Sequence, residues 1–459
     1  MKKYFLSKLV VAALILSAAL TGCSKDKKGK LSRLDIGNAT AVLTASNGTK
    51  SLTKSTMESD MLLKITDSGV VETSFIDDEG NVINKTFWSV IHEIENHDYF
   101  VMKLWDISST ATSDKDFRYN DYLYLVRKKD GNIIAIEGID VIDYHFLIRN
   151  RGTIIHDEKG NLYFESRDID LFTPQRITKV EISGGSATVT HLPGTENAML
   201  LTVSTKGDVY YIGSGNYTYV LTPNGRVHNL SELMTEELGY NISIWGGIWR
   251  GSGNEMRILT SSGSSDVHTV NIDNNGDISV DSSPRYYDFW INPNYIITFP
   301  NRVLLLDGNY SPTSGYELIV EVENPSNTPR AIKLNYNFPL SPGHAHAPEG
   351  SCSVRDVKNT DKHYYLHGTD GYYNYEEYKW VDGSSFLIKV NPTTDAVTEL
   401  VAAGVYNIKH FTVSSNDEVT FNAVRKSDGV SILGKFTASG QFQLIEETNI
   451  NVTEMISTR

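Results

Sequence analysis

Short runs of β-branched and aromatic residues recur along most of the chain, and Gly, Asn and Asp separate them. Alternating or brief apolar runs bounded by such residues are typical of β-strands. The clearest helical pattern is short and covers residues 231–238, with Ser231 in the N-cap position and Gly239 after it. We therefore predict an all-β chain with a few short helical turns.

The recurring unit is a β-hairpin: an apolar strand, a polar turn and a second apolar strand. Many of the turns contain Asp-Gly or Asn-Gly, because type I′ turns need positive φ and Gly adopts it without strain. Eight hairpins fit this description, with turns at 67–69, 130–131, 184–185, 224–225, 275–276, 325–327, 391–395 and 439–440.

A second strand pair often precedes the hairpin, with turns at 159–161, 206–208 and 415–417, so the repeat has four strands. The seven intervals between Gly69 and Gly440 average (440 − 69)/7 = 53 residues. Blades of β-propellers are about 40 to 50 residues long. This spacing predicts a β-propeller of four-stranded antiparallel blades, with eight blades favoured and seven possible if C-terminal strands complete the first blade. A pair of β-sandwiches is the alternative.

The N-terminus has the order of a secretory signal: Lys2, Lys3 and Lys8, then an apolar run at 9–16. The sequence Leu20-Thr21-Gly22-Cys23 follows, and it resembles the lipobox of bacterial lipoproteins. That resemblance implies that Cys23 is lipidated and that residues 1–22 are a signal peptide. The polar residues 23–33 are then a flexible tether, and 34–459 form one propeller domain.

The same resemblance implies a cell-envelope protein that contacts the membrane through its lipid anchor. Ser24 after the cysteine resembles the sorting signal of outer-membrane lipoproteins. Whether the domain faces the periplasm or the cell surface is left open at this point.

Charge and cysteine content exclude some classes of protein. The net charge of −14 argues against a nucleic-acid partner, which requires a basic face. Two cysteines exclude a disulfide framework, and beyond Cys23 only Cys352 remains, which we expect to pack as a small hydrophobic residue.

In its spacing the chain resembles the divergent TolB-like propellers of secreted bacterial proteins. The quinoprotein-like propeller of the outer-membrane assembly machinery has a recurring Trp after its Asp-Gly turns, and that Trp is missing here.

One candidate site is a metal site. His344 and His346 alternate along an extended segment, so both would point to one side, and Glu349, His363 or His367 would complete a divalent-metal site. The alternative is a polar loop between blades that needs no cofactor. A run at 273–277 superficially resembles a calcium loop, but it occurs where a hairpin turn is required.

The second candidate site is aromatic. Exposed rings with polar ends bind sugars and peptides, because they bury much area at a small cost in entropy. Trp245 and Trp249 would lie on the preceding blade, whereas Tyr364 and Tyr365 are expected to point one inward and one outward. The ligand-binding candidates are Tyr372, Tyr373, Tyr375, Tyr378 and Trp380, with Tyr286, Tyr287 and Trp290 on the same face.

The sequence contains no phosphate-binding loop, no nucleophile elbow and no His-Glu-x-x-His motif. We therefore predict a non-catalytic binding or scaffold protein for a protein, peptide or glycan. The alternative is an extracytoplasmic hydrolase or lyase that degrades polysaccharide or peptide in the propeller funnel.

Overall fold

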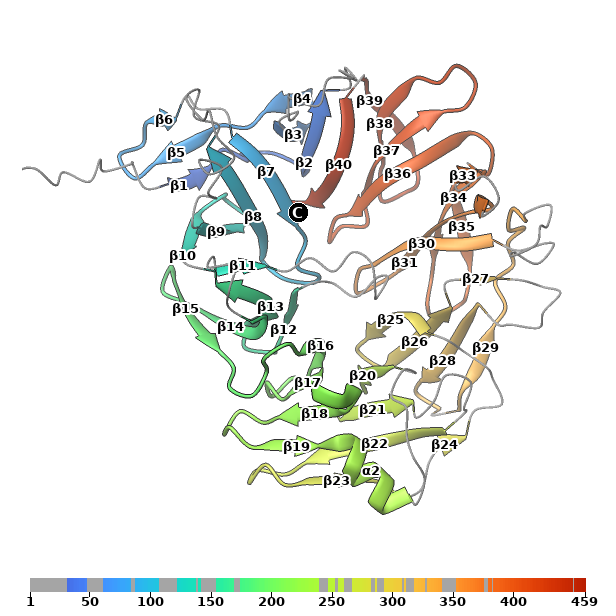
Figure 1. Cartoon of the computed structure of the whole chain (residues 1–459). Coiled ribbons are helices and arrows are strands. Elements are labelled where there is room, and N and C mark those ends of the chain that lie inside the picture. Colours follow the sequence, from blue (N-terminus) through green and yellow to red (C-terminus); the bar gives the residue numbers. More distant parts are fainter. Residues whose placement is uncertain are drawn as a thin grey trace, which may run out of the picture.

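A computed structural model describes most of the chain. The described residues are 31–47, 61–83, 87–106, 122–137, 139–141, 154–168, 174–238, 247–251, 255–259, 266–281, 285–286, 293–307, 309–310, 318–326, 328–340, 352–374, 379–381, 383–448 and 450–459. Sheets of antiparallel strands follow one another around a ring (Figure 1). Eight of these sheets, counted over the described ranges, form the blades of a β-propeller.

The first four blades contain the strands of the N-terminal half. Blade 1 combines β2 (Ala41–Asn47), β3 (Met61–Thr66) and β4 (Gly69–Glu72) with the C-terminal strand β40 (Ile450–Ser457). Blade 2 contains β7 (Phe87–His92), β8 (Tyr99–Asp106), β9 (Tyr122–Arg127) and β10 (Ile133–Glu137). Blade 3 contains β12 (Ile154–His156), β13 (Leu162–Asp168), β14 (Arg176–Ser183) and β15 (Ser186–His191). Blade 4 contains β16 (Met199–Val203), β17 (Val209–Ile212), β18 (Thr218–Leu221) and β19 (Val227–Asn229).

The other four blades follow in chain order. Blade 5 contains β20 (Ile248–Arg250), β21 (Met256–Leu259), β22 (Asp266–Ile272) and β23 (Ile278–Val280). Blade 6 contains β25 (Pro293–Phe299), β26 (Arg302–Asp307), β28 (Ile319–Glu323) and β29 (Arg330–Ile332). Blade 7 contains β30 (Cys352–Asn359), β31 (Tyr364–Thr369), β34 (Ser385–Val390) and β35 (Val397–Val401). Blade 8 contains β36 (Tyr406–Val413), β37 (Val419–Arg425), β38 (Ser431–Phe436) and β39 (Phe442–Glu447).

Smaller elements are added to this ring. A three-stranded sheet outside the ring contains β1 (Leu31–Leu34), β5 (Phe75–Asp77) and β6 (Val82–Ile83). Extra strands are β11 (Ile139–Val141), β24 (Arg285–Tyr286) and β27 (Asn309–Tyr310), and β32 (Tyr372–Asn374) pairs with β33 (Lys379–Val381). The helical elements of the described part are the short 3₁₀ turn η1 (Ser214–Asn216) and the helix α2 (Leu230–Leu238).

The helix α2 starts one residue earlier than predicted, and its N-cap is different. The side-chain oxygen of Asn229 accepts a hydrogen bond from the backbone N–H of Glu232 at 3.1 Å, so Asn229 caps the helix. The hydroxyl of Ser231 instead accepts from the N–H of Thr218 at 2.9 Å. Ser231 is therefore buried between the helix and β18.

The eight hairpins predicted from the sequence are the two outermost strands of the eight blades. Each joins the third and fourth strands of its sheet, from β3–β4 in blade 1 to β38–β39 in blade 8. Their turns contain the expected glycines, such as Gly225 with φ 85° and Gly276 with φ 81°. The 273–277 segment is a turn in which the Asp273 carboxylate accepts from the N–H groups of Asn275 and Asp277.

The two ends of the described chain close the ring. β40 pairs antiparallel with β2 from Ala41↔Ser457 to Asn47↔Ile450. The hydroxyl of Thr458 also donates to the carbonyl of Ala39 at 2.7 Å. The C-terminal strand thus completes the blade of the first hairpin, and the blade count stays at eight.

The core consists of layers between neighbouring blades. Each of the eight blade–blade interfaces has its own cluster of buried apolar side chains, including the one between blades 8 and 1. Tyr364 and Tyr365 point to opposite faces of blade 7, as strand alternation requires, but both are fully buried. The expectation that one of them faces outward is wrong, because a neighbouring blade covers each face.

A buried ion network joins blades 6 and 7. The carboxylate of Glu321, only 1% exposed, accepts from Arg302 Nη1 at 2.5 Å and from Arg330 Nε at 2.6 Å. Arg330 also pairs with Asp395 of blade 7 at 2.8 Å, and Arg302 donates to the carbonyl of Pro392 at 2.9 Å. A buried carboxylate tolerates desolvation when several charged donors surround it.

Candidate functional site

A pocket of about 380 Å³ occupies the part of the ring where the inner strands of five blades converge. Its walls combine aliphatic side chains with charged and amide groups. It is lined by Glu95, Asn96, Ile154, Ile155, His156, Leu201, Thr202, Ile248, Trp249, Arg250, Ile296, Thr298 and Asn359. We call it the ring-centre pocket. Its volume is within the range of small-molecule and peptide-anchor sites.

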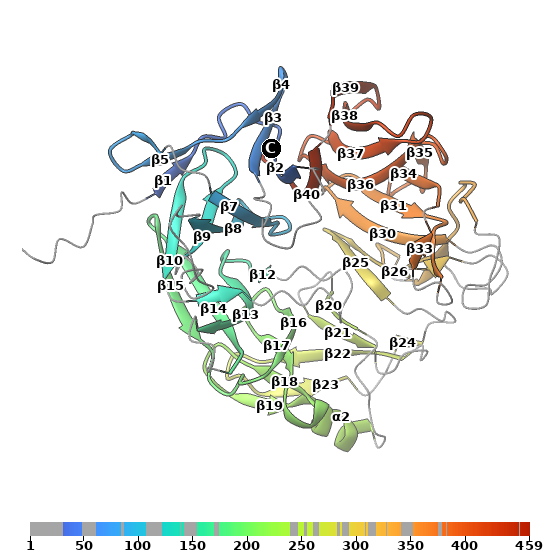
Figure 2. The same cartoon turned by 45° about the horizontal axis from the view of Figure 1, so that its top comes forward.

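The loop 93–98 covers one side of the ring-centre pocket. It joins β7 to β8, and both views show it reaching toward the middle of the ring (Figures 1 and 2). Lys358 of blade 7 donates to the Glu93 carboxylate at 2.8 Å, which ties blade 2 to a blade that is not its neighbour. On the other side, the ring of His97 lies 3.3 Å from the carbonyl of Gly160 in blade 3. The loop is therefore held from two directions.

Arg250 connects three inner strands at the edge of the pocket. It is the last residue of β20, and its Nε donates to the carbonyl of Val203 at 2.7 Å, where β16 ends. Its Nη2 donates to the carbonyl of His156, the last residue of β12. Burial lowers the pKa of Arg250, against the opposing effect of Asp157 and Glu158. A guanidinium held in this way presents its remaining N–H groups in a fixed orientation.

Charged groups gather beside the loop 93–98. Burial alone would raise the pKa of Glu93, but Lys358 and Lys128 outweigh it and lower the pKa. Burial would likewise lower the pKa of Lys358, but Asp356 and Glu93 raise it. Glu93 and Lys358 therefore form a stable ion pair that positions the loop.

Glu95 differs from Glu93 in its environment. Glu95 is exposed to solvent where it lines the pocket. The hydration that its carboxylate loses to the neighbouring protein raises the pKa of Glu95, and the nearby Glu93 and Asp356 add to the effect, although Lys358 and Lys128 oppose it. The Glu95 carboxylate therefore has a larger capacity to bind an added cation than the paired Glu93.

Two histidines pack together below the loop, with ring centroids 5.1 Å apart. His156 lies within hydrogen-bonding distance of two carbonyls, that of Glu95 at 3.1 Å and that of Asp157 at 2.9 Å. The Nδ1 of His97 accepts from the N–H of Tyr99 at 3.2 Å. Burial, and secondly the neighbouring His156, lower the pKa of His97, which suits a neutral ring.

Trp249 contributes a buried polar atom to the pocket wall. Its side chain is 2% exposed, and its indole nitrogen has no hydrogen-bond partner among the residues that the structure describes. The aliphatic side chains of Ile154, Leu201, Ile248 and Ile296 line the same space. The pocket thus offers an apolar wall together with one carboxylate, one guanidinium, one imidazole, two amides and two hydroxyls.

The predicted aromatic site lies mostly outside the described side chains. The backbones of Tyr372 and Tyr373 form β32, Trp380 is in β33, and Tyr286 is in β24. The remaining candidates, Tyr375, Tyr378, Tyr287 and Trp290, lie outside the described residues, as does Trp245. Trp249 lines the ring-centre pocket.

The predicted metal ligands His344 and His346, like Glu349, also lie outside the described residues. His363 pairs with Asp417 at 3.0 Å. His367 is buried against Phe411, and burial lowers its pKa to about 3. Within the described ranges, no group of three or more His, Cys, Asp or Glu side chains is placed to hold a metal ion.

Most residues of the ring-centre pocket, including Arg250, His156, Glu95 and Asn359, were not predicted from the sequence. Three of these four residues share one positional signal: His156, Arg250 and Asn359 are each the last residue of an inner strand, whereas Glu95 lies in the loop after β7. The turn at 159–161 follows the end of β12, and the turn at 206–208 follows the end of the inner strand β16, so the sequence marks two inner-strand ends although it contains no local binding motif there.

No protein-family model and no curated protein matches the chain. Among solved structures, a protein from Lactobacillus plantarum is 14% identical, with a TM-score of 0.37, covering 78% of this chain and 98% of its own. A structure of YCF48 bound to D1 peptide is 10% identical, with a TM-score of 0.35, covering 67% and 86%. These values carry no argument about function. The strand pairing itself establishes that this chain folds as an eight-bladed β-propeller.

Proposed function

We propose that the protein is an extracytoplasmic binding module that takes a peptide segment into the ring-centre pocket. The observation that carries this proposal is the combination of Glu95, Arg250, Asn96 and Asn359 around an aliphatic wall. The carboxylate suits an ammonium or a lysine side chain, and the guanidinium and amides suit peptide carbonyls. The wall accepts an apolar side chain.

The rigid framework supports this proposal. The Glu93–Lys358 ion pair and the bonds of Arg250 hold the loop and the strand ends before any ligand arrives. A preorganised pocket binds with a smaller entropic cost than one that must order on binding. A neutral glycan lacks the cationic group that Glu95 favours, so it fits this pocket less well.

The test is an array of peptides and glycans probed with the full chain in detergent. We expect peptides with a basic group next to an apolar residue to be retained. Glu95→Gln removes the negative charge and should weaken their binding about tenfold, the value of one charge-assisted contact. The matched control is Glu72→Gln on the exposed outer strand β4, which should bind normally. Retention of glycans alone would contradict the peptide proposal.

We also propose that the protein is a lipoprotein of the outer membrane, anchored through Cys23 with its tether at 23–33. The support is the signal-like start and the Leu20-Thr21-Gly22-Cys23 sequence. No helix in the described ranges is long and apolar enough to cross a membrane. Cell fractionation with a Cys23→Ala variant tests the anchor, and unchanged sedimentation with the membranes would contradict it. Separation of inner from outer membranes tests the location.

A second candidate function is hydrolysis of a bound peptide or polysaccharide. The observation that favours it is the position of Glu95 in the pocket wall, where reduced hydration raises its pKa and so favours the protonated form that a general acid needs. Mass spectrometry of the retained ligands decides between the two functions. Cleavage that Glu95→Gln abolishes would support the enzyme, whereas intact ligands support binding alone.

A further inference from the structure

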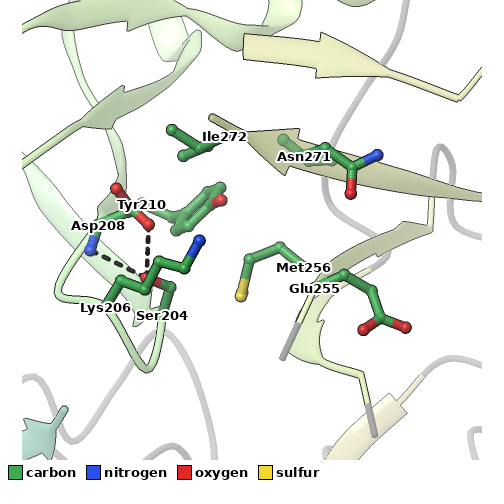
Figure 3. Close-up of a pocket in the computed structure, with 9 residues that line it drawn as sticks. Ser204, Lys206, Asp208, Tyr210, Glu255, Met256, Asn271 and Ile272 are labelled. Carbon is green, nitrogen blue, oxygen red and sulfur yellow. Dashed lines mark hydrogen bonds between the residues drawn. The ribbon is translucent and has the colours of Figure 1, made fainter. Parts of the chain in front are cut away.

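A second pocket, of about 150 Å³, lies between blades 4 and 5 and shares no lining residue with the ring-centre pocket (Figure 3). One wall comes from β17 and the turn before it, and the other from β21 and β22. It is lined by Ser204, Lys206, Asp208, Tyr210, Glu255, Met256, Val270, Asn271 and Ile272. We call it the inter-blade pocket.

The hydroxyl of Tyr210 is a buried group without a partner. The residue is fully buried, and its oxygen makes no hydrogen bond to any part of the chain that the structure describes. Leaving a buried hydroxyl unpaired costs about 1–3 kcal/mol, so such a group calls for an explanation. Burial, and secondly Asp208, raise the pKa of Tyr210, so the oxygen keeps its proton and acts as a donor.

Lys206 supplies a second free donor to the same space. Its side chain is exposed, and its ammonium has no hydrogen-bond or ion-pair partner within the described ranges. Lys206 and Tyr210 both line this pocket, together with Met256 from the facing blade (Figure 3). A charged donor and a neutral donor therefore converge on one small volume.

The acidic groups of this pocket are already occupied. The Asp208 carboxylate accepts from the hydroxyl of Ser204 at 2.6 Å. Burial raises the pKa of Asp208, although the hydrogen bond from Ser204 and the charge of Lys206 oppose the shift. Glu255 pairs with Arg257 at 2.5 Å, and Figure 3 shows its carboxylate turned away from Tyr210. Tyr210 and Lys206, the two groups argued above to lack partners, are both donors, so the group that would satisfy both is an acceptor.

The rest of the wall is apolar. Met256 and Val270 are each 2% exposed, and Ile272 is partly buried against the same cluster. A cavity of about 150 Å³ holds a benzene-sized molecule, which corresponds to about six non-hydrogen atoms. A four-carbon carboxylic acid has this size.

We propose that the inter-blade pocket binds a short aliphatic carboxylate, with its oxygens on Lys206 and Tyr210 and its chain on Met256 and Val270. The same chemistry occurs in a free short-chain acid and in the C-terminal carboxylate of a peptide that ends in a small apolar residue. The carboxylate satisfies both unpartnered donors, and the ammonium replaces part of the water that an anion loses on entry.

The test is calorimetric titration of the full chain in detergent with butyrate and with its uncharged analogue butyramide. We expect butyrate to bind with a Kd on the order of 1 mM, a value within reach of a six-atom ligand, and butyramide to bind at least tenfold more weakly. Lys206→Met and Tyr210→Phe should each weaken butyrate binding about tenfold, because each removes one donor. Tyr219→Phe, a hydroxyl deletion on the neighbouring strand β18, is the matched control and should bind normally.

Both variants should fold, because Lys206 is exposed and Phe keeps the ring of Tyr210. Thermal unfolding checks this. Without ligand, Tyr210→Phe should unfold at the same temperature as the parent chain or above it, because it deletes an unpaired hydroxyl. Absence of butyrate binding, or equal binding of butyrate and butyramide, would overturn the proposal. Equal affinity in all variants would do the same.

Competition separates the two sources of the carboxylate. A peptide that ends in a free valine should displace butyrate if the ligand is a chain end, whereas its amidated form should not. Failure of both to compete assigns the pocket to free acids. Glu95→Gln should leave butyrate binding unchanged, so this proposal and the proposed peptide-binding function are tested separately.

Discussion

Glu165 provides a quantitative test of how blades 3 and 4 are joined. The residue is 8% exposed and lies on β13. Its carboxylate accepts from the N–H of Leu200 in blade 4 at 2.8 Å and from Gln175 Nε2 at 2.5 Å. Burial raises the pKa of Glu165 to about 7, although the hydrogen bond from Leu200 opposes the shift. The reference value for an exposed glutamate is 4.5.

The sign of the effect on stability follows from proton linkage. Between pH 4.5 and 7 the folded state holds a proton that the unfolded state has released, so stability falls as the pH rises. A shift of about 2.5 pH units at 1.36 kcal/mol per unit amounts to about 3 kcal/mol. About 2 kcal/mol of this loss falls between pH 5.5 and pH 8.5, because the unfolded state is already mostly ionised at the lower pH.

Urea unfolding at these two pH values, with and without Glu165→Gln, measures the contribution. The amide imitates the protonated acid and does not titrate, so the variant should lose about 2 kcal/mol less between pH 5.5 and 8.5 than the parent chain. The matched control is Glu72→Gln, which changes the same residue type on an exposed strand. An identical pH dependence in the parent and in Glu165→Gln would refute the reasoning.

Three further predictions concern packing. Glu321→Ala leaves two arginines without their shared carboxylate and should destabilise the fold by about 3–5 kcal/mol in urea unfolding; a loss below 1 kcal/mol would contradict the network. Burial raises the pKa of the Cys352 thiol to about 12, so it should react with a thiol reagent at pH 8 only after unfolding, and rapid labelling of the native chain would disprove this. Gly131→Ala places a methyl group against the carbonyl of Leu34 at φ +74°, so it should lower the free energy of unfolding by about 1–3 kcal/mol, as urea titration would show. A change within 0.5 kcal/mol would argue against that contact.

The repeat was predictable because it depends on local chemistry. Most outer hairpins have a turn residue with positive φ between two apolar strands. Pairs such as Asn275-Gly276 identify that turn from the local sequence alone. The closure by β40 was also open to prediction, since a ring of repeats leaves its first blade incomplete. The turn residues and the spacing of the hairpins were therefore enough to predict the fold class and to favour eight blades.

The burial of individual side chains was harder to predict than the pairing of the strands. Strand alternation correctly sent Tyr364 and Tyr365 to opposite faces, but it does not say what covers each face. In a propeller both faces of a blade meet a neighbour, so adjacent residues on β31 are both buried. The N-cap of α2 shows a similar limit: Ser231 has the right chemistry, but packing against β18 engages its hydroxyl, and Asn229 caps the helix.

The ring-centre pocket could not be predicted from local motifs, because no single segment of the chain contains it. Glu95, His156, Arg250 and Asn359 come from four blades and lie far apart in the sequence, yet the ring of blades brings the ends of β12, β20 and β30 and the loop after β7 to one pocket. What these positions share is their register within the repeat rather than a sequence motif. In a divergent propeller, therefore, the residues that end the inner strands are the ones to inspect first for binding chemistry. The same holds for the inter-blade pocket: Tyr210 and Met256 lie on β17 and β21, the second strands of blades 4 and 5, and only the ring brings these two strands together.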